Sequence, residues 1–338
     1  HAARHALLSK CGRPPVCAIP AMAAAAWAAY SGGLRGLCTD FLPGPVEPDG
    51  VVMAVSMVIV AALGTFLPQL LLEKWAWRLQ HLSIDPDASV PERSRLVADA
   101  WRNQFTATFV APLLLWPLAT PLMGRTALLR LSFGPQLPRW PVFLLSELVL
   151  VVCNDVGAYW FHRALHELPG LYRFHAQHHQ FRPTTSISTQ WVGTLESVLA
   201  IAGFALGVVV YNAAFGALHA TQLLAAVLYA ALEAVHSHSG YRFFAVSPFP
   251  NEWGDAAAGK DVRTAFHYYH HTHVVGNYGL PYVDVAFGTF GRYRQYVARC
   301  VAARAKSEAK SQGGAEAEAE AEAEAKAEAE AEVEARGF

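Results

Sequence analysis

Long uncharged runs are the feature that most limits how this chain can fold. Residues 51–72 and residues 103–124 each form 22 consecutive positions without Asp, Glu, Lys or Arg. As helices they would be about 33 Å long, which is enough to cross the hydrocarbon core of a bilayer. Residues 140–161 form a third apolar stretch, interrupted by Glu147 and Asp155. These runs predict membrane-spanning helices.

A fourth run, residues 197–232, has 36 positions without Asp, Glu, Lys or Arg. It is too long for one span and suits two short spans that turn near residues 212–216. The chain is 53% hydrophobic and only 16% charged, which is less charge than a soluble domain of this length carries. The predicted fold class is therefore an all-α, polytopic integral membrane helical bundle with five spans. The alternative is a set of buried helices in a large soluble protein.

Basic residues flank several of these predicted spans, and cytosolic loops are enriched in Lys and Arg. With two spans between the first basic loop and residue 162, and two more before residue 267, these segments share one membrane face. That face is predicted to be cytosolic. The basic residues are Lys74, Arg78, Arg93 and Arg95 in the first loop, and Arg163, Arg173, Arg182, Lys260, Arg263, Arg292 and Arg294 farther along.

Both ends of the chain differ from the apolar middle, and three regions are expected. Residues 1–50 form a basic, Ala-rich leader, which is either a targeting segment or contains a short extra span near residues 18–30. Residues 51–300 form the membrane domain, and residues 301–338 form a low-complexity tail of Ala and Glu. The five cysteines are scattered without a Cys-x-x-Cys pair, which indicates neither a disulfide framework nor a thiolate metal site.

Histidines gather in three clusters in the second half of the chain. Residues three or four apart lie on one face of a helix, so each cluster can direct two or three imidazoles to one point. A single zinc site needs three or four ligands, whereas these clusters supply eight imidazoles. Two metal ions fit better. The clusters are His162 with His166, then His175, His178 and His179, then His267, His270 and His271.

Ligand type alone does not choose the metal, because imidazole suits zinc, copper, iron and nickel. Two redox-active irons near a membrane face could oxidise unactivated C–H bonds with dioxygen, which no side chain can do unaided. Zinc could not carry the electrons. The chain has no Gly-x-Gly-x-x-Gly fingerprint and no haem-binding module, so electrons are expected to come from separate proteins.

Four further residues are candidate ligands or partners of ligands. Asp155 lies seven residues before His162, two helical turns back, and could orient its imidazole. His236 and His273 lie beside the clusters, where ligation and a local hydrogen-bonding role are both open. Asn277 either stabilises a turn with its neighbouring glycines or replaces a ligand.

The clusters also resemble the histidine boxes HxxxH, HxxHH and HxxHH of the fatty acid hydroxylase and sterol desaturase superfamily. Their order in residues 162–166, 175–179 and 267–271 is the same, and the resemblance covers roughly residues 105–293. Residues 159–161 (Tyr-Trp-Phe), 238–241 (His-Ser-Gly-Tyr) and 276–279 (Gly-Asn-Tyr-Gly) are similar to the sterol 4-methyl oxidase branch. The resemblance adds His238 as a ninth ligand.

The resemblance implies a membrane di-iron oxygenase domain at residues 51–300, with a histidine-lined di-metal site on the cytosolic face of the endoplasmic reticulum. A chloroplast membrane is the alternative location. The implied reaction uses dioxygen to oxidise the 4-methyl group of a sterol precursor. NAD(P)H would supply electrons through cytochrome b5 and its reductase, and no nucleic-acid partner is expected.

Other functions share these motifs and stay open at this point. Sterol C5-desaturation and hydroxylation of a fatty acyl chain or a carotenoid use the same boxes. A histidine-rich metal transporter is an alternative from another class, although its ligands would be expected near the bilayer midplane. An intramembrane zinc protease is disfavoured, because His166-Glu167 lacks the second histidine of HExxH.

Overall fold

The computed structural model describes residues 18–41, 48–79, 83–84, 94–182, 184–241, 262–274, 276–296, 298–299 and 302. The first 17 residues and the Ala/Glu run of the tail lie outside this set, so the predictions for them are untested. The chain divides into two compact units. The first comprises His1–Leu70, Ala98–Asn154 and Ile201–Glu233, and the second comprises Leu71–Val97, Asp155–Ala200 and Ala234–Phe338.

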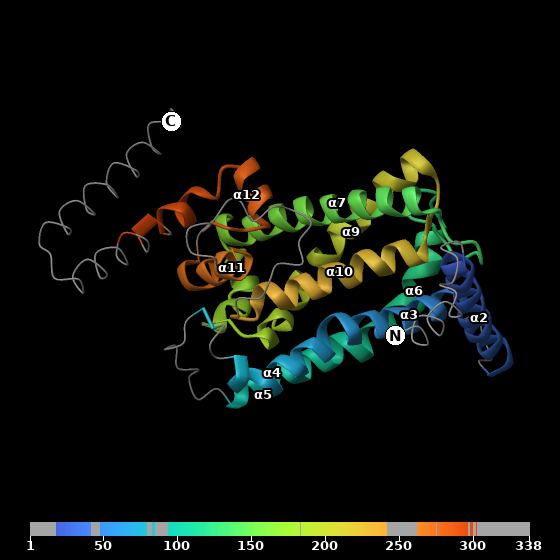
Figure 1. Cartoon of the computed structure of the whole chain (residues 1–338), viewed down its shortest axis with the longest axis horizontal. Helices are drawn as coiled ribbons and strands as arrows, with labels where there is room; N and C mark the ends of the chain where they lie inside the picture. The colour runs from blue at the N-terminus through green and yellow to red at the C-terminus, as the bar shows by residue number, and fades with distance from the viewer. Residues whose placement is uncertain are drawn as a thin grey trace, which may run out of the picture. The chain divides into compact units, whose positions relative to one another are not determined.

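Helices make up nearly all of the described chain (Figure 1). A pair of two-residue parallel strands, β1 (Leu131–Ser132) and β2 (Leu218–His219), is the exception among the described residues. The α-helices are α2 (Ala18–Phe41), α3 (Pro48–Ala61), α4 (Leu67–Leu79), α5 (Ser94–Phe105), α6 (Ala111–Gly124), α7 (Trp140–Glu167), α8 (Tyr172–His175), α9 (Thr194–Phe215), α10 (Ala220–His238), α11 (Val262–His273) and α12 (Pro281–Ala286).

Four helical stretches are long and apolar enough to cross a membrane: Pro48–Leu79, Arg95–Gly124, Trp140–Glu167 and Thr194–Phe215. They confirm the prediction of an all-α integral membrane protein. The predicted turn near residues 212–216 is also present, because α9 ends at Phe215 and Gly216 has a positive φ of 89°.

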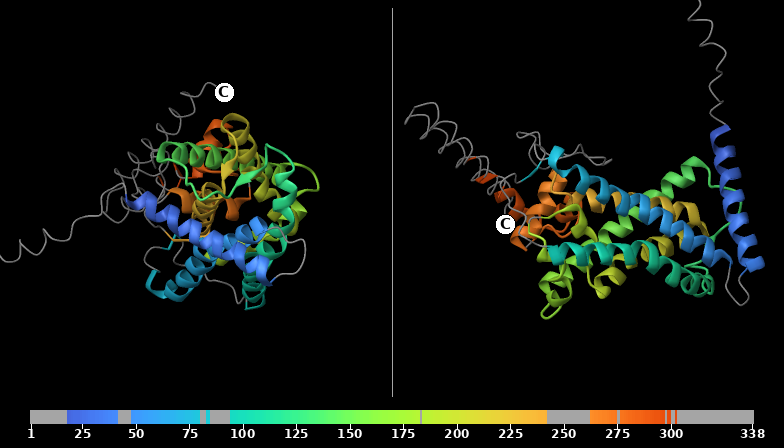
Figure 2. Two further views of the ribbon diagram at one scale, coloured as in Figure 1. Left: turned by 90° about the vertical axis from the view of Figure 1, so that its right-hand side faces the viewer. Right: turned by 90° about the horizontal axis from the view of Figure 1, so that it is seen from below.

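These stretches account for four of the five predicted spans. Helix α10, which follows the turn, carries Glu233, His236 and His238 in its last two turns and is not among the four, so the fifth span stays a prediction. Helix α2, which contains the marginal segment near residues 18–30, is not among them either. It is turned across α3 rather than lying along it (Figures 1 and 2).

Two of the apolar stretches contain a π-helical turn at the same place relative to a proline. Turn η1 (Ala62–Phe66) ends just before Leu67-Pro68, and turn η3 (Thr106–Val110) ends just before Ala111-Pro112. The proline ring clashes with the carbonyl of residue i−4 in a regular helix, and a wider turn relieves that clash. In both cases the residue before proline donates its N–H five residues back.

The first unit is held together by an apolar core and by close helix contacts at small residues. Val52, Met53, Leu150 and Leu218 are fully buried in that core. A Cβ built on Gly64 would lie 2.7 Å from the Ala231 side chain, so any larger residue there would push these helices apart. Small residues at such contacts let membrane helices pack closely, because lipid gives little hydrophobic drive for association.

Candidate metal centre

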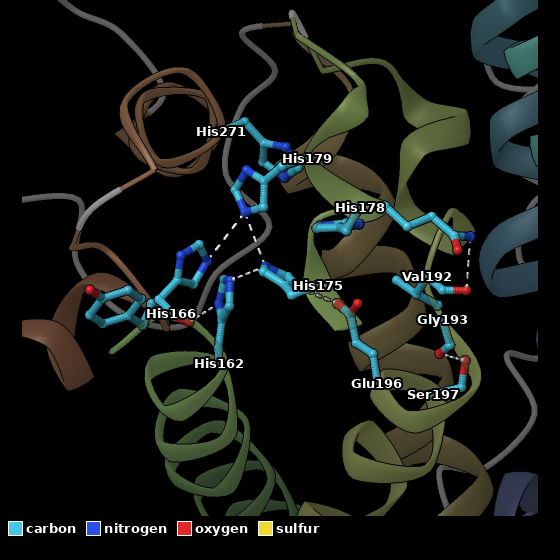
Figure 3. Close-up of polar contacts among 12 residues, drawn as sticks. His162, His166, His175, His178, His179, Val192, Gly193, Glu196, Ser197 and His271 are labelled. Atoms are coloured by element: carbon cyan, nitrogen blue, oxygen red, sulfur yellow. Dashed lines mark hydrogen bonds and ion pairs between the residues drawn. The ribbon is translucent and has the colours of Figure 1, made fainter. Parts of the chain in front are cut away.

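Nine histidines of the second unit converge into two groups whose ring nitrogens could each hold a metal ion. The first, called the five-histidine group, contains His162, His166, His175, His179 and His270. The second, called the four-histidine group, contains His178, His238, His267 and His271. Within each group the candidate ligand atoms lie within 4.8 Å of one another. Figure 3 shows six of these imidazoles arriving from different segments.

The spacing of the histidines within each sequence cluster decides which of the two groups they join. Pairs four residues apart stay in one group: His162 and His166 at the end of α7, and His175 and His179 in α8 and the 3-10 turn η4 (His178–Gln180). On α11, His267 and His271 behave in the same way.

The remaining histidine of each later cluster crosses to the other group. His178 joins the four-histidine group and His270 joins the five-histidine group, while His238 arrives from the last residue of α10. The second and third clusters therefore each serve both candidate metal positions. This differs from the expectation that one cluster directs its imidazoles to one point.

The Nε2 atoms face one another at distances that suit a shared cation. In the five-histidine group, Nε2 of His175 lies 2.9 Å from that of His162 and 3.0 Å from that of His179. In the four-histidine group, Nε2 of His267 lies 2.8 Å from that of His238 and 3.1 Å from that of His271. Two imidazoles bound at right angles, about 2.1 Å from one ion, would have nitrogens about 3.0 Å apart. The spacing therefore fits two metal ions.

Backbone carbonyls fix the tautomer of three of these imidazoles. Nδ1 of His162 lies 2.6 Å from the carbonyl of Tyr278, Nδ1 of His270 lies 2.7 Å from that of Gly276, and Nδ1 of His238 lies 2.7 Å from that of Ala234. A carbonyl can only accept, so each Nδ1 carries the proton and each Nε2 keeps a free lone pair. Among the described residues, the buried Nε2 of His270 has no hydrogen-bond partner.

Glu196, in the first turn of α9, lies beside a fourth imidazole (Figure 3). Its Oε1 is 2.9 Å from Nδ1 of His175, but the N–H direction is off the line of a hydrogen bond. From the sequence, Glu196 could be an interface residue as readily as a partner of a ligand. Its signal was a lone carboxylate at the edge of a long apolar run.

The four additional candidates lie in other surroundings. Asp155 accepts a 2.5 Å hydrogen bond from the hydroxyl of Tyr282. His236 is half-buried and in neither group, and His273 is exposed with its ring stacked on Tyr269 at 4.2 Å. Asn277 is fully buried with a φ of 60° and donates to the carbonyl of Phe266, as a turn residue does.

Burial keeps the imidazoles in the neutral form that binds metals. It lowers the pKa of His178, His267, His270 and His271 well below the usual value, and neighbouring imidazoles lower it further. Burial also lowers the pKa of His179 to about 3. Neutral imidazoles without bulk water around them are suited to a divalent cation.

The segment that carries these histidines is similar to a known protein family. Residues 147–289 match the fatty acid hydroxylase family model. This segment contains all nine histidines of the two groups. The match confirms the resemblance inferred from the three boxes.

Three relatives illustrate the similarity. Methylsterol monooxygenase 1 of Danio rerio is 29% identical over 50% of this chain and 55% of its own length. A putative methylsterol monooxygenase of Dictyostelium discoideum is 26% identical over 72% of this chain and 86% of its own length. A very-long-chain aldehyde decarbonylase of Oryza sativa subsp. indica is 32% identical over 47% and 57%.

The chain spans about half the length of three curated relatives that it matches. No solved structure matches it.

Proposed function

We propose that this protein is a membrane-bound di-iron monooxygenase that oxidises C–H bonds of a sterol-like lipid with dioxygen. The observation that carries the proposal is the convergence of nine imidazoles into two groups within a segment similar to fatty acid hydroxylases. Similarity to methylsterol monooxygenases supports the 4-methyl group of a sterol precursor as the position of attack.

Each of the two groups would bind one metal ion in this proposal. Their Nε2 atoms bind the metals, with His162, His166, His175, His179 and His270 at one ion and His178, His238, His267 and His271 at the other. Two bound irons would supply the redox chemistry with dioxygen that no side chain provides.

The carbonyls of Tyr278, Gly276 and Ala234 hold the protons on Nδ1, which orients the rings. Burial of His175, His270 and His271 keeps bulk water from the ligand atoms.

Electron supply and location complete the proposal. We place the protein in the endoplasmic reticulum with the histidine groups facing the cytosol, where cytochrome b5 and its reductase would deliver electrons from NAD(P)H. The positive-inside tendency of the loops beside α4 and α7 supports this orientation.

Incubation of the purified full-length chain in detergent tests the proposed reaction. The reaction contains NAD(P)H, cytochrome b5, its reductase, a 4-methyl sterol and ¹⁸O₂, and products are read by mass spectrometry. We expect ¹⁸O in the oxidised methyl group and two irons per chain. Protein that contains only zinc and consumes no sterol would contradict the proposal. A His271→Ala variant of equal expression is the matched negative control.

The similarity to the rice decarbonylase supports a long-chain aldehyde as a second candidate substrate. The same incubation with such an aldehyde in place of the sterol would then yield a hydrocarbon one carbon shorter. Desaturated sterol or hydroxylated acyl products would identify the other members of the enzyme class. Metal flux in vesicles without oxygen-dependent turnover would instead support a transporter.

A further inference from the structure

Residues 276–280 form a loop whose carbonyl groups contact two imidazoles, both of which belong to the five-histidine group. The carbonyl of Gly276 accepts from His270, and the carbonyl of Tyr278 accepts from His162. Gly276 and Asn277 have φ values of 76° and 60°, a left-handed pair that turns both carbonyls to the histidines. The loop thus fixes two imidazoles that come from different clusters, more than a hundred residues apart.

Asp284 holds this loop from the opposite side. Its side chain is fully buried. Its Oδ1 accepts from the backbone N–H of Tyr278 at 2.9 Å, and its Oδ2 accepts from the N–H of Gly279 at 2.7 Å. The hydroxyl of Thr289 donates to Oδ1 at 2.6 Å. All three partners are donors, so the site is built for a carboxylate, which only accepts.

One peptide group joins Asp284 to His162. The N–H of Gly279 and the carbonyl of Tyr278 belong to the same peptide unit, so the carboxylate binds one end of it and the imidazole N–H binds the other. Hydrogen bonds in such a chain polarise one another and strengthen together. There is little room for the loop to move, because a Cβ on Gly279 would meet the Tyr159 side chain at 3.1 Å.

The same network returns to the first box through hydroxyl groups. Thr289 donates to Asp284, so the hydroxyl of Tyr159, 3.1 Å from that of Thr289, can donate to Thr289 in turn. The guanidinium of Arg163 donates to the Tyr159 hydroxyl at 3.0 Å. One end of the network is the imidazole of His162, and the other is Arg163, the next residue in the chain.

We propose that Asp284 is a positioning residue that orients His162 and His270 through the 276–280 loop and thereby sets metal affinity at the five-histidine group. It touches no ligand directly. No described contact of this loop reaches the carbonyl-fixed ligand of the other group, since His238 is held by Ala234 on its own helix. The effect of Asp284 is therefore specific to one of the two metal positions. The inference rests on the proposed two-metal site but not on its reaction.

Cobalt(II) titration of the metal-free, full-length protein in detergent tests this inference without turnover. Visible absorbance reports imidazole-bound cobalt and gives the number of ions and their affinities. In Asp284→Asn one carboxylate oxygen becomes an NH₂ group, which places a donor against a donor. We expect the wild type to bind two ions, and Asp284→Asn to bind one normally and the other with about 10- to 100-fold lower affinity.

Reference variants identify the weakened position. His270→Ala removes a ligand of the five-histidine group and His267→Ala one of the four-histidine group, so the spectrum of Asp284→Asn should resemble that of His270→Ala. Thr289→Val removes one donor to Asp284 and should lower the affinity for the same ion by a smaller factor. Thr289→Ser keeps the hydroxyl and should retain the wild-type affinity. Asp99→Asn, at an exposed ion pair with Arg102, is the control for loss of an acidic charge.

The outcomes separate the inference from the proposed function. Two ions bound by Asp284→Asn with wild-type affinities, or equal weakening of both, would overturn the positioning role. If Asp284→Asn does not fold, Thr289→Val and Thr289→Ser decide the question by the same criterion. A wild-type protein that binds no cobalt would remove the metal site itself and the inference with it. Two cobalt ions without sterol turnover would count against the reaction alone.

Discussion

The imidazoles of the two histidine groups are held in place by different means. In the five-histidine group, His162 and His270 are fixed by a separate loop and His175 lies beside a buried carboxylate from the first turn of α9. In the four-histidine group, His238 is fixed by Ala234, one turn back on its own helix. His162 is therefore fixed by a contact 116 residues away in the sequence, whereas His238 is fixed by local helix geometry.

The two groups are therefore expected to respond differently to changes in residues that are not ligands. The 276–280 loop and Glu196 contact described imidazoles of the five-histidine group, so changes there should reach that group selectively. The four-histidine group should be sensitive mainly to its own ligands and to the end of α10.

The largest expected effects come from removing one ligand of each group. We expect His162→Ala and His238→Ala each to lower turnover at least about 100-fold. Loss of a residue that only hydrogen-bonds to a metal ligand already costs about 10- to 100-fold, and these variants lose the ligand itself. Metal analysis should show one ion in place of two in each variant. Loss of both ions in either variant would mean that the groups form one coupled site, which would break the comparison.

Glu196→Gln is expected to produce a smaller, selective change. The amide keeps the size of the side chain but replaces one carboxyl oxygen near Nδ1 of His175 with an NH₂ group. Metal affinity at the five-histidine group should fall about tenfold, with the other position unchanged. Cobalt titration measures this, and Asp99→Asn, at the exposed pair with Arg102, is a carboxylate control. An unchanged affinity would show that the carboxylate does not support His175.

The stability of the metal-free protein should depend on pH in the acidic range. Burial lowers the pKa of His179 to about 3 in the folded state, whereas an unfolded chain has a value of about 6.5. The unfolded state therefore binds more protons between these values, so stability is fully present above about pH 6.5 and is lost as the pH falls. Thermal unfolding from pH 7.5 to 5 checks this, and the dependence should be weaker in His179→Gln.

The smallest effect is expected for His273→Ala. This exposed imidazole stacks on Tyr269 and belongs to neither group, although the sequence made it a candidate ligand. Metal content and both cobalt affinities should match the wild type, and the free energy of unfolding should change by no more than about 0.5 kcal/mol. Loss of one ion would add His273 to a coordination shell and alter the boundary between the groups.

Much of the site could be predicted because its residues carry a strong local signal. Histidines at i and i+4 on predicted helices indicated the imidazoles that now lie together, and family-like residues around His238 added the ninth. The split of His178 and His270 between groups could not be foreseen, since it depends on the approach of η4 to α11. Asp284 gave no signal either, because its partners are backbone N–H groups that every residue offers.

The fold shows the same contrast between local and tertiary information. Apolar runs predicted the four spanning helices and the turn at Gly216, since length and hydropathy are local properties. Helix α10 was predicted as a span because residues 220–232 lack Asp, Glu, Lys and Arg, and Glu233, His236 and His238 follow at once in the same helix. The Asp155 prediction rested on helical spacing and on a charge within an apolar run, and in the structure its carboxylate accepts a hydrogen bond from Tyr282.

The two π-helical turns are places where related chains can differ in length by one residue. A π turn contains one residue more than an α turn, and each residue rotates a helix by about 100°. Deleting one residue within Ala62–Phe66 or Thr106–Val110 can therefore be absorbed by a return to α geometry, without rotating the helix on either side. Single-residue gaps between related sequences are expected at these two places, provided that Pro68 or Pro112 is replaced as well.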